Sequence, residues 1–215
     1  MLLRAQKGKV IIMAIGKNIE TRGHIVGFKE EISKAADSGE DEFFTWFDNA
    51  KNKNAAFIRG AWDFIVHIAL PSSKFLSTPE EKIALEIGHG GGRILSAASR
   101  CFQSVIGVDI HENNEKVEDE LKKRGINNFS LIKTDGKQIP IESGSVDFIY
   151  SFIVLQHIEK IEVFRTYLHE TFRLLKPNGI AVLYFGRKYF LSINRASKIL
   201  YLVDKYSERF IIPKG

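Results

Sequence analysis

Hydrophobic and polar positions follow two different rhythms along the chain, and the change falls near residue 80. Between Phe43 and Leu70 apolar positions recur every three or four residues, which predicts helix with a break over 51–54. Pro71 is expected to end this helical stretch, and Ser38 is expected to cap its start. Residues 1–37 are interrupted by four glycines, so no element is predicted there.

From Glu80 onward short apolar runs alternate with longer amphipathic segments, which is the pattern of strands joined by helices. Such an alternation predicts a parallel sheet with helices on both faces. The expected strands span residues 83–87, 104–110, 129–133, 146–152 and 180–185. The expected helices span 93–101, 112–124, 161–175 and 193–206, and a short sixth strand is expected over 209–212.

The predicted fold class is therefore α/β: a Rossmann-like three-layer sandwich with a mostly parallel sheet, preceded by an N-terminal helical cap. We divide the chain into a helical segment or lid over 1–78 and a sheet domain over 79–215. Residues 43–64 hold seven aromatic residues, including both tryptophans. They indicate either a lid over a ligand cleft or a helical pair that buries large rings against the sheet domain.

Composition narrows the class of protein. The chain has 215 residues, 44% of them hydrophobic and 27% charged, which is typical of a globular protein of one α/β domain and a small addition. The apolar run Val10–Ile15 is too short to span a bilayer, and we recognise no targeting segment. A single cysteine, Cys101, excludes an internal disulfide and a cysteine-based zinc site, and is expected in a small core position. These features favour a cytoplasmic location and predict no metal.

The net charge of +5 comes from one end of the chain. From Arg187 onward there are seven basic and two acidic residues, so the rest of the chain is balanced. A basic end of this kind suits an anionic partner, but it also occurs on solvated helix faces, which we favour. The basic end shows no interleaving of aromatic and basic residues of an RNA-binding kind, so the sequence gives no strong nucleic-acid signal.

The strongest chemical signal is the glycine-rich segment that directly follows the first predicted strand of the sheet. Its letters are Leu-Glu-Ile-Gly-His-Gly-Gly-Gly over residues 85–92. Glycines at such a turn let backbone N–H and C=O groups approach a nucleotide-like ligand. A dinucleotide fingerprint requires a third glycine where Arg93 stands. The segment therefore disfavours a nicotinamide cofactor and a role as an NAD-dependent oxidoreductase.

Two acids follow the next two predicted strands. Asp109 ends the second strand, 21 residues after Gly88, where a carboxylate can accept hydrogen bonds from both hydroxyls of a ribose. Asp135 follows the third strand, where it can accept from an exocyclic amine of adenine or serve only as a turn residue.

Together with the segments 145–152, 156–158 and 174–179, these motifs resemble the class I S-adenosylmethionine-dependent methyltransferases over residues 80–186. The resemblance implies S-adenosylmethionine as cofactor and a sheet with a seventh, antiparallel strand. It implies that Glu86 places the methionine amino group, with Gly88 and Gly90 lining the methionine and ribose. It further implies ribose binding by Asp109, adenine contacts by Ile110, Asp135 and Gly136, and a place for Ser151 beside the methionine.

Two features depart from the family pattern, His89 and the short C-terminal segment, and one further residue, His157, is a candidate for catalysis. His89 stands where the family more often has a small residue; it can touch the cofactor, but we expect it to point to solvent. His157, just past the fourth strand, is a candidate base, although a structural role for it is favoured and the catalytic residue is not assigned. Only 29 residues follow Gly186, so we expect a shortened member or one that lacks its last hairpin strand. An open sheet edge would invite homodimer formation.

Two functional hypotheses follow from the resemblance. The first is a methyltransferase that acts on a small-molecule or glycan-precursor acceptor, favoured by the segment 150–159. The alternative is a non-catalytic protein that binds S-adenosylmethionine or S-adenosylhomocysteine on the same fold. The acceptor itself is not identified by the sequence.

Overall fold

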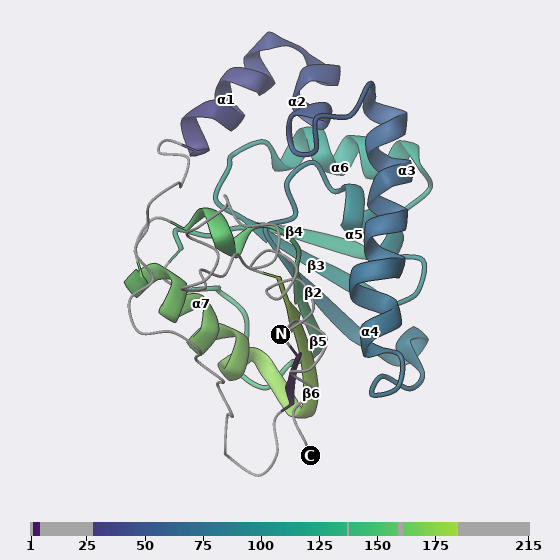
Figure 1. Cartoon of the computed structure of the whole chain (residues 1–215), viewed down its shortest axis with the longest axis vertical. Coiled ribbons are helices and arrows are strands. Elements are labelled where there is room, and N and C mark those ends of the chain that lie inside the picture. Colours follow the sequence, from purple (N-terminus) through teal and green to yellow (C-terminus); the bar gives the residue numbers. More distant parts are fainter. Residues whose placement is uncertain (1, 5–27, 137, 159–160, 185–215) are drawn as a thin grey trace, which may run out of the picture.

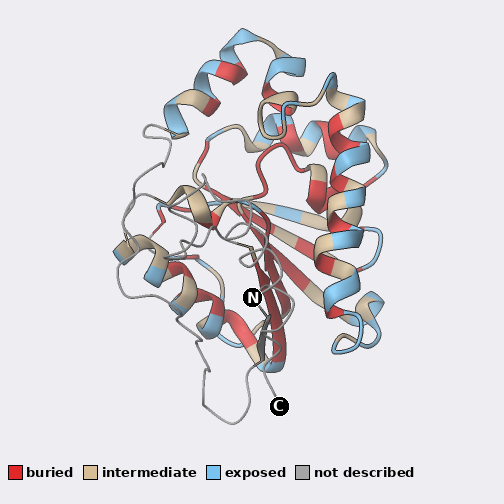
Figure 2. Cartoon of the chain, viewed as in Figure 1, coloured by how far each residue is buried: buried red, intermediate tan, exposed pale blue. Residues whose placement is uncertain are grey.

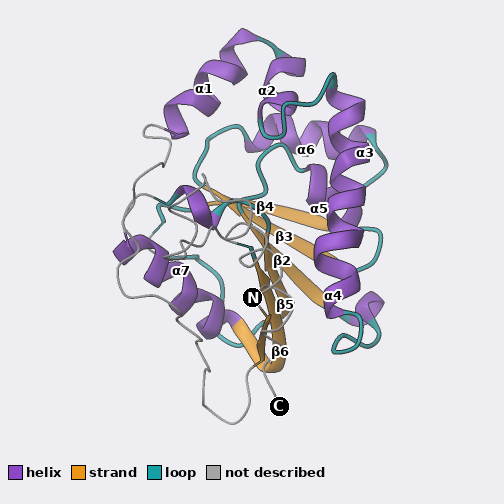
Figure 3. Ribbon diagram, viewed as in Figure 1, coloured by secondary structure: helices purple, strands orange, loops and turns teal. Residues whose placement is uncertain are grey.

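The fold is that of a computed structural model, which describes residues 2–4, 28–136, 138–158 and 161–184. Its centre is a six-stranded sheet with the order β1-β6-β5-β2-β3-β4. The strands are β1 (Leu2–Arg4), β2 (Ile83–Ile87), β3 (Ser104–Asp109), β4 (Phe129–Lys133), β5 (Val146–Ser151) and β6 (Leu175–Leu183). Figures 1 and 3 show the strands fanning across the middle of the molecule between two groups of helices.

Five strands run parallel, which confirms the predicted α/β fold class and Rossmann-like sheet. The order reverses beside β2, since β3 lies on one side of it and β5 on the other. In open sheets of this kind ligands bind at such a reversal, outside the carboxyl ends of the strands. β6 starts earlier than the predicted strand: Leu175 pairs with Val146, and the chain then bulges before Ile180 pairs with Phe148.

The N-terminal strand β1 was not predicted. It pairs antiparallel with β6, so that Leu3 faces Ala181. The position beyond the fifth parallel strand, which we expected to be open, is therefore occupied over residues 180–182. Residues 180–182 therefore offer no open edge for pairing with a second copy. The predicted homodimer stays a prediction.

The cap consists of a series of helices between β1 and β2. They are α1 (Phe28–Ser38), α2 (Glu40–Trp46), α3 (Lys53–Asp63), the π-helix η1 (Phe64–Ala69) and the single turn α4 (Leu70–Ser72). A break is confirmed, but it lies over residues 47–52, because α3 begins at Lys53. Asn52 caps α3 by accepting from the Ala55 N–H. The short 3-10 helix η2 (Pro79–Glu81) leads into β2.

Two predicted helix ends are wrong. Ser38 ends α1 instead of capping the next helix, because its hydroxyl donates to the Lys34 carbonyl within α1. Pro71 lies inside the helical path instead of ending it. The turn before it has widened, so that the Leu70 N–H donates to the Ile65 carbonyl five residues earlier.

Three further helices flank the sheet: α5 (Arg93–Ala98), α6 (Asn114–Lys123) and α7 (Ile161–Leu174). Alternate strand residues face opposite sides, as a sheet covered on both faces requires. Ala84, Phe148 and Tyr150 pack under the cap, whereas Leu85 and Ile149 pack under α7. Figure 2 shows this buried centre along the strands and the exposed outer surfaces of the helices.

The aromatic segment divides between the two interpretations offered for it. Four of its rings are buried in the core under the cap: Phe43, Phe44, Phe57 and Phe64. Phe47 instead lies against the glycine-rich segment, and Trp62 is exposed. Core packing thus accounts for most of the aromatic rings in this segment. Phe47 fits the interpretation as a lid over a ligand cleft, and neither interpretation accounts for the exposed Trp62.

Several expectations meet a different outcome or fall outside the described residues. Cys101 is exposed and follows the end of α5, so its prediction as a core residue is wrong. The helix over 193–206, the strand over 209–212 and the basic end of the chain lie outside the described ranges. None of the described helices is long and apolar enough to cross a bilayer.

Candidate functional site

A cavity of about 1000 Å³ lies at the carboxyl ends of β2, β3 and β5. The cap covers it from one side and the loop after β5 and α7 from another. Typical ligand pockets have about 300–1,000 Å³, so the cavity has room for a nucleoside cofactor and a small acceptor. The cavity is lined by all the predicted site residues except Ser151, together with His157.

The glycine-rich segment forms the floor of this cavity. Gly88 has φ +79°, and a Cβ on it would lie 2.4 Å from a methyl carbon of Val154. Gly90 has φ +51°, and its Cβ would lie 2.8 Å from the ring of Phe47. Both positions need glycine for backbone conformation and for space. The glycines thereby let Val154 and Phe47 pack directly against the backbone of this segment, which lines the cavity.

Asp109 ends β3 beside this floor and is nearly buried. Its Oδ2 accepts from the Gly90 N–H at 2.8 Å, and its Oδ1 accepts from the Ile110 N–H at 2.7 Å. Burial alone would raise the pKa of Asp109, but His111, His89 and these N–H groups hold it below its usual value. The carboxylate is therefore ionised and fixed in orientation at neutral pH.

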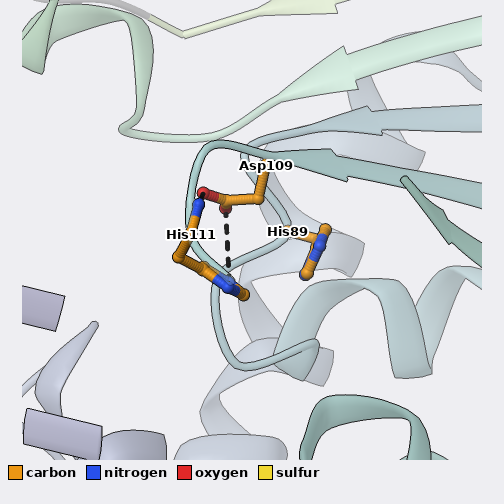
Figure 4. A group of neighbouring side chains, drawn as sticks. All are labelled: His89, Asp109 and His111. Atoms are coloured by element: carbon orange, nitrogen blue, oxygen red, sulfur yellow. Dashed lines mark hydrogen bonds and ion pairs between the residues drawn. The ribbon is translucent and has the colours of Figure 1, made fainter. Parts of the chain in front are cut away.

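Two buried histidines flank Asp109 (Figure 4). His111 accepts from the Asn113 N–H at Nδ1, so its Nε2 carries the hydrogen that it donates to the Gly90 carbonyl at 3.0 Å. His89 approaches the same carbonyl through Nδ1 at 2.9 Å. Burial lowers the pKa of His89, so that ring is neutral. The prediction that His89 points to solvent is wrong, since its side chain is turned inward beneath the cap.

The same three residues are the one group in the described ranges whose donor atoms could meet at a metal ion, lying within 4.8 Å of one another. The hydrogen-bond pattern gives these atoms another role, because the ring nitrogens nearest the Gly90 carbonyl donate hydrogens to it. We therefore interpret the group as a support that holds the Gly90 peptide between two imidazoles and the Asp109 carboxylate.

Glu86 is the second buried acid of the cavity and lies on β2. Desolvation raises its pKa to about 8, although the Tyr150 hydroxyl donates to its Oε2 at 3.1 Å. Below this pH the side chain is neutral in the structure. A cationic group placed beside it would favour its ionised form, so Glu86 fits the expected place of the methionine amino group.

The remaining predicted residues divide into two groups. Ile110, Asp135 and Gly136 line the cavity on the β3 and β4 side, where an adenine is expected. Ser151 lies outside the lining, because its buried hydroxyl donates to the Ile87 carbonyl and joins β5 to β2. His157 ends the 3-10 helix η3 (Leu155–His157) at the cavity, and its ring stacks on Phe28 at 4.9 Å.

The cap contributes residues that the sequence did not single out. Asp63 of α3 pairs with Arg93, the residue at the third glycine position, at 2.5 Å. α3 and α5 approach closely at Gly60, where a Cβ would lie 2.3 Å from the Arg93 carbonyl. Asp48 also lines the cavity, and its Oδ2 is buried without a hydrogen bond among the described residues. Their helical pattern predicted a cap, but no motif marked these charges.

Fold and site together define a class: a Rossmann-like domain with a cavity at the switch point of its sheet, where proteins of this fold bind ligands. Residues 85–183 match the family model described as a methyltransferase domain. One curated relative, the tRNA (carboxymethyluridine(34)-5-O)-methyltransferase ALKBH8 of Macaca fascicularis, is 30% identical over 106 residues. These residues are 49% of this chain and 15% of the relative.

A second relative, the demethylmenaquinone methyltransferase of Geobacillus stearothermophilus, is 35% identical over 79 residues, which are 36% of this chain and 32% of the relative. The chain thus matches less than a third of either relative's length. Among solved structures, the PH0226 protein from Pyrococcus horikoshii OT3 is 21% identical, with a TM-score of 0.53. That likeness covers 74% of this chain and 66% of the other, and it supports the fold alone.

Over residues 85–183, less than half of its length, the chain is therefore similar to methyltransferase domains, as the sequence resemblance implies. The match supports the cofactor expected from the sequence, S-adenosylmethionine.

Proposed function

We propose that the protein transfers the methyl group of S-adenosylmethionine to a small-molecule or glycan-precursor acceptor. The observation that carries the proposal is the pairing of a neutral acid, Glu86, with an ionised one, Asp109, on either side of the glycine floor. Glu86 would meet the methionine amino group, and Asp109 would accept from the ribose hydroxyls. Asp135 and Gly136 would contact the adenine.

The charge of the cavity supports a small acceptor over a nucleic acid. Six acids line it but only three lysines and arginines: Glu30, Asp48, Asp63, Glu86, Asp109 and Asp135 against Lys29, Arg59 and Arg93. Even without the neutral Glu86, the acids outnumber the basic residues by five to three. An acidic lining repels the phosphates of a polynucleotide and favours a neutral or cationic ligand. Rings of Phe28, Phe47 and Phe152 add apolar walls.

Bound S-adenosylmethionine supplies an activated methyl group, so the protein needs no covalent catalytic residue. Its work is to align the acceptor and exclude water, which an aromatic-walled cavity under a cap suits. His157 stays a candidate base. Because its ring is packed on Phe28, we expect His157→Gln to keep kcat within about tenfold; a loss of a hundredfold or more would make it the base.

Methyl transfer is tested with S-adenosylmethionine labelled in its methyl group. Small amines and alcohols, sugar nucleotides, lipid-soluble phenols and tRNA are offered as acceptors in parallel, with Asp109→Ala as the inactive control. We expect label to enter one small-molecule class and to be lost in the variant. Label only in tRNA would overturn the acceptor class. Tight binding of S-adenosylhomocysteine without any transfer would favour the non-catalytic binding protein.

The location of the protein stays a prediction. A cytoplasmic place is inferred from the single cysteine, which suits a reducing compartment.

A further inference from the structure

Among the described residues, large apolar side chains are exposed mainly at one place. In the described ranges eight are exposed, and six of them lie within residues 58–75. These six, which we call the outer face, are 40% to 65% exposed: Ile58, Trp62, Ile65, Val66, Leu70 and Phe75. Single exposed apolar residues are ordinary, but a cluster of this size indicates a binding surface.

The outer face is continuous because of helix geometry. Ile58 and Trp62 are four residues apart on α3, and Ile65 and Val66 follow at three and four residues. The wide turn of η1 then places Leu70 one turn beyond Ile65, since the Leu70 N–H donates to the Ile65 carbonyl. The opposite side of the same helices is buried on the sheet domain through Phe57, Gly60, Phe64 and Ile68. Figure 2 shows exposed and buried residues alternating along α3.

Basic residues outnumber acidic ones over residues 49–79, and Glu80 and Glu81 follow directly after them. Residues 49–79 contain a single carboxylate, Asp63, which is paired with Arg93. Lys51 precedes α3 and Lys74 follows α4; both are exposed, and neither is paired with a carboxylate in the described part of the chain. The Nζ of Lys74 lies 4.8 Å from the centre of the Phe75 ring. The outer face is thus an apolar ridge between basic ends.

We propose that the outer face docks on an anionic lipid membrane. A helix that lies in a membrane interface presents aliphatic and tryptophan side chains to the acyl boundary and lysines to the headgroups, and residues 51–75 do both. A lipid surface also accepts a projecting ridge without a complementary groove. Arg59, Asp63 and His67 of the same helices line the cavity, so docking would place the cavity beside the membrane.

The test is sedimentation of the purified full chain with vesicles of phosphatidylcholine containing about one third phosphatidylserine. This binding requires neither cofactor nor acceptor, so its outcome is independent of the proposed methyl transfer. We expect the protein to sediment with these vesicles and to bind much less to phosphatidylcholine alone. Lys51→Gln/Lys74→Gln should lower partitioning at least about tenfold, because each lysine near such a surface contributes about 1 kcal/mol.

Apolar contact is tested with Trp62→Glu/Leu70→Glu, which should abolish sedimentation. Phe172→Glu is the matched control, because Phe172 is 42% exposed on α7, outside the outer face, and its loss should leave binding unchanged. Circular dichroism confirms that each variant is folded. In a Trp46→Phe background the emission of Trp62 should shift to the blue with vesicles.

Two results would overturn the proposal. The first is a wild-type chain that stays in the supernatant with anionic vesicles. The second is a wild-type dimer that Trp62→Glu/Leu70→Glu converts to a monomer while vesicles bind neither form, which would make the outer face a contact between two copies.

Discussion

The two buried carboxyl groups of the cavity, Glu86 and Asp109, lie on neighbouring strands but differ in protonation at neutral pH. Glu86 is neutral and Asp109 is ionised. Glu86 receives one hydroxyl hydrogen bond, and burial raises its pKa to about 8. Asp109 is also buried, but it receives backbone N–H groups and lies beside His111, so its pKa is lowered. The comparison shows that the neighbours of a buried acid, first the histidines and then the N–H donors, decide whether burial leaves it ionised.

The largest effect on cofactor affinity is expected from substitution of Asp109, the ionised acid. Asp109→Ala removes two charge-assisted hydrogen bonds to a ribose, each worth about 1.5–3 kcal/mol, and should weaken S-adenosylhomocysteine binding by a hundredfold or more. Calorimetric titration measures the affinity, and circular dichroism confirms the fold. Asp119→Ala is the matched control, because Asp119 is exposed on α6. Equal affinities of the two variants would contradict the ribose assignment.

The protonated side chain of Glu86 should make the free energy of unfolding depend on pH. The pKa of Glu86 is raised above its unfolded value, so the folded state holds a proton that the unfolded state loses above pH 4.5. The free energy of unfolding should therefore fall by up to about 1.4 kcal/mol per pH unit between pH 4.5 and 8. Glu86→Gln should remove this slope, as urea unfolding at pH 6 and pH 8 measures. Equal slopes in both proteins would show that Glu86 is already ionised.

The glycine floor between the two acids should tolerate no side chain. Gly88→Ala places a Cβ against Val154 at positive φ, and should cost about 1–3 kcal/mol of stability. Gly88→Ala/Val154→Ala relieves the contact but keeps the backbone strain, so it should recover part of the loss. Thermal unfolding compares the two variants. Full stability of Gly88→Ala would mean that the floor is not tightly constrained.

The smallest effect on cofactor affinity is expected from substitution of His111, which lies beside Asp109 and donates to the Gly90 carbonyl. His111→Phe removes one donor to the Gly90 carbonyl, a hydrogen bond worth about 0.5–1.5 kcal/mol. We expect cofactor affinity to fall about fivefold. An effect as large as that of Asp109→Ala would show that His111 itself meets the ligand.

Much of this arrangement could be predicted from sequence, because local patterns determine it. β2 and β4 have the predicted bounds, and the glycines and acids at the strand ends meet in one cavity as the parallel sheet requires. β1 could not be predicted, since three residues before a glycine-interrupted stretch carry no period. The side chain of His89 was misplaced because tertiary packing buries it: the cap covers a loop that would otherwise be open to solvent.

Ser151 was expected beside the methionine from the family resemblance. In the structure its hydroxyl donates to the Ile87 carbonyl and so joins β5 to β2.

The charged cap residues Asp48 and Asp63 were missed because their place depends on tertiary packing. Asp63 of α3 and Asp48, in the turn before α3, both lie near Arg93 of α5 in the folded chain, and no sequence pattern reports those distances.

The central claim is that Glu86 and Asp109 hold two parts of one cofactor, the methionine amino group and the ribose. Calorimetric titration with S-adenosylhomocysteine at pH 7, in buffers of different ionisation enthalpy, tests it most directly. The account predicts release of close to one proton, because the methionine amino group would ionise Glu86, and no release in Glu86→Gln. Tight binding by the wild-type chain without proton release, or tighter binding of NAD, would contradict it.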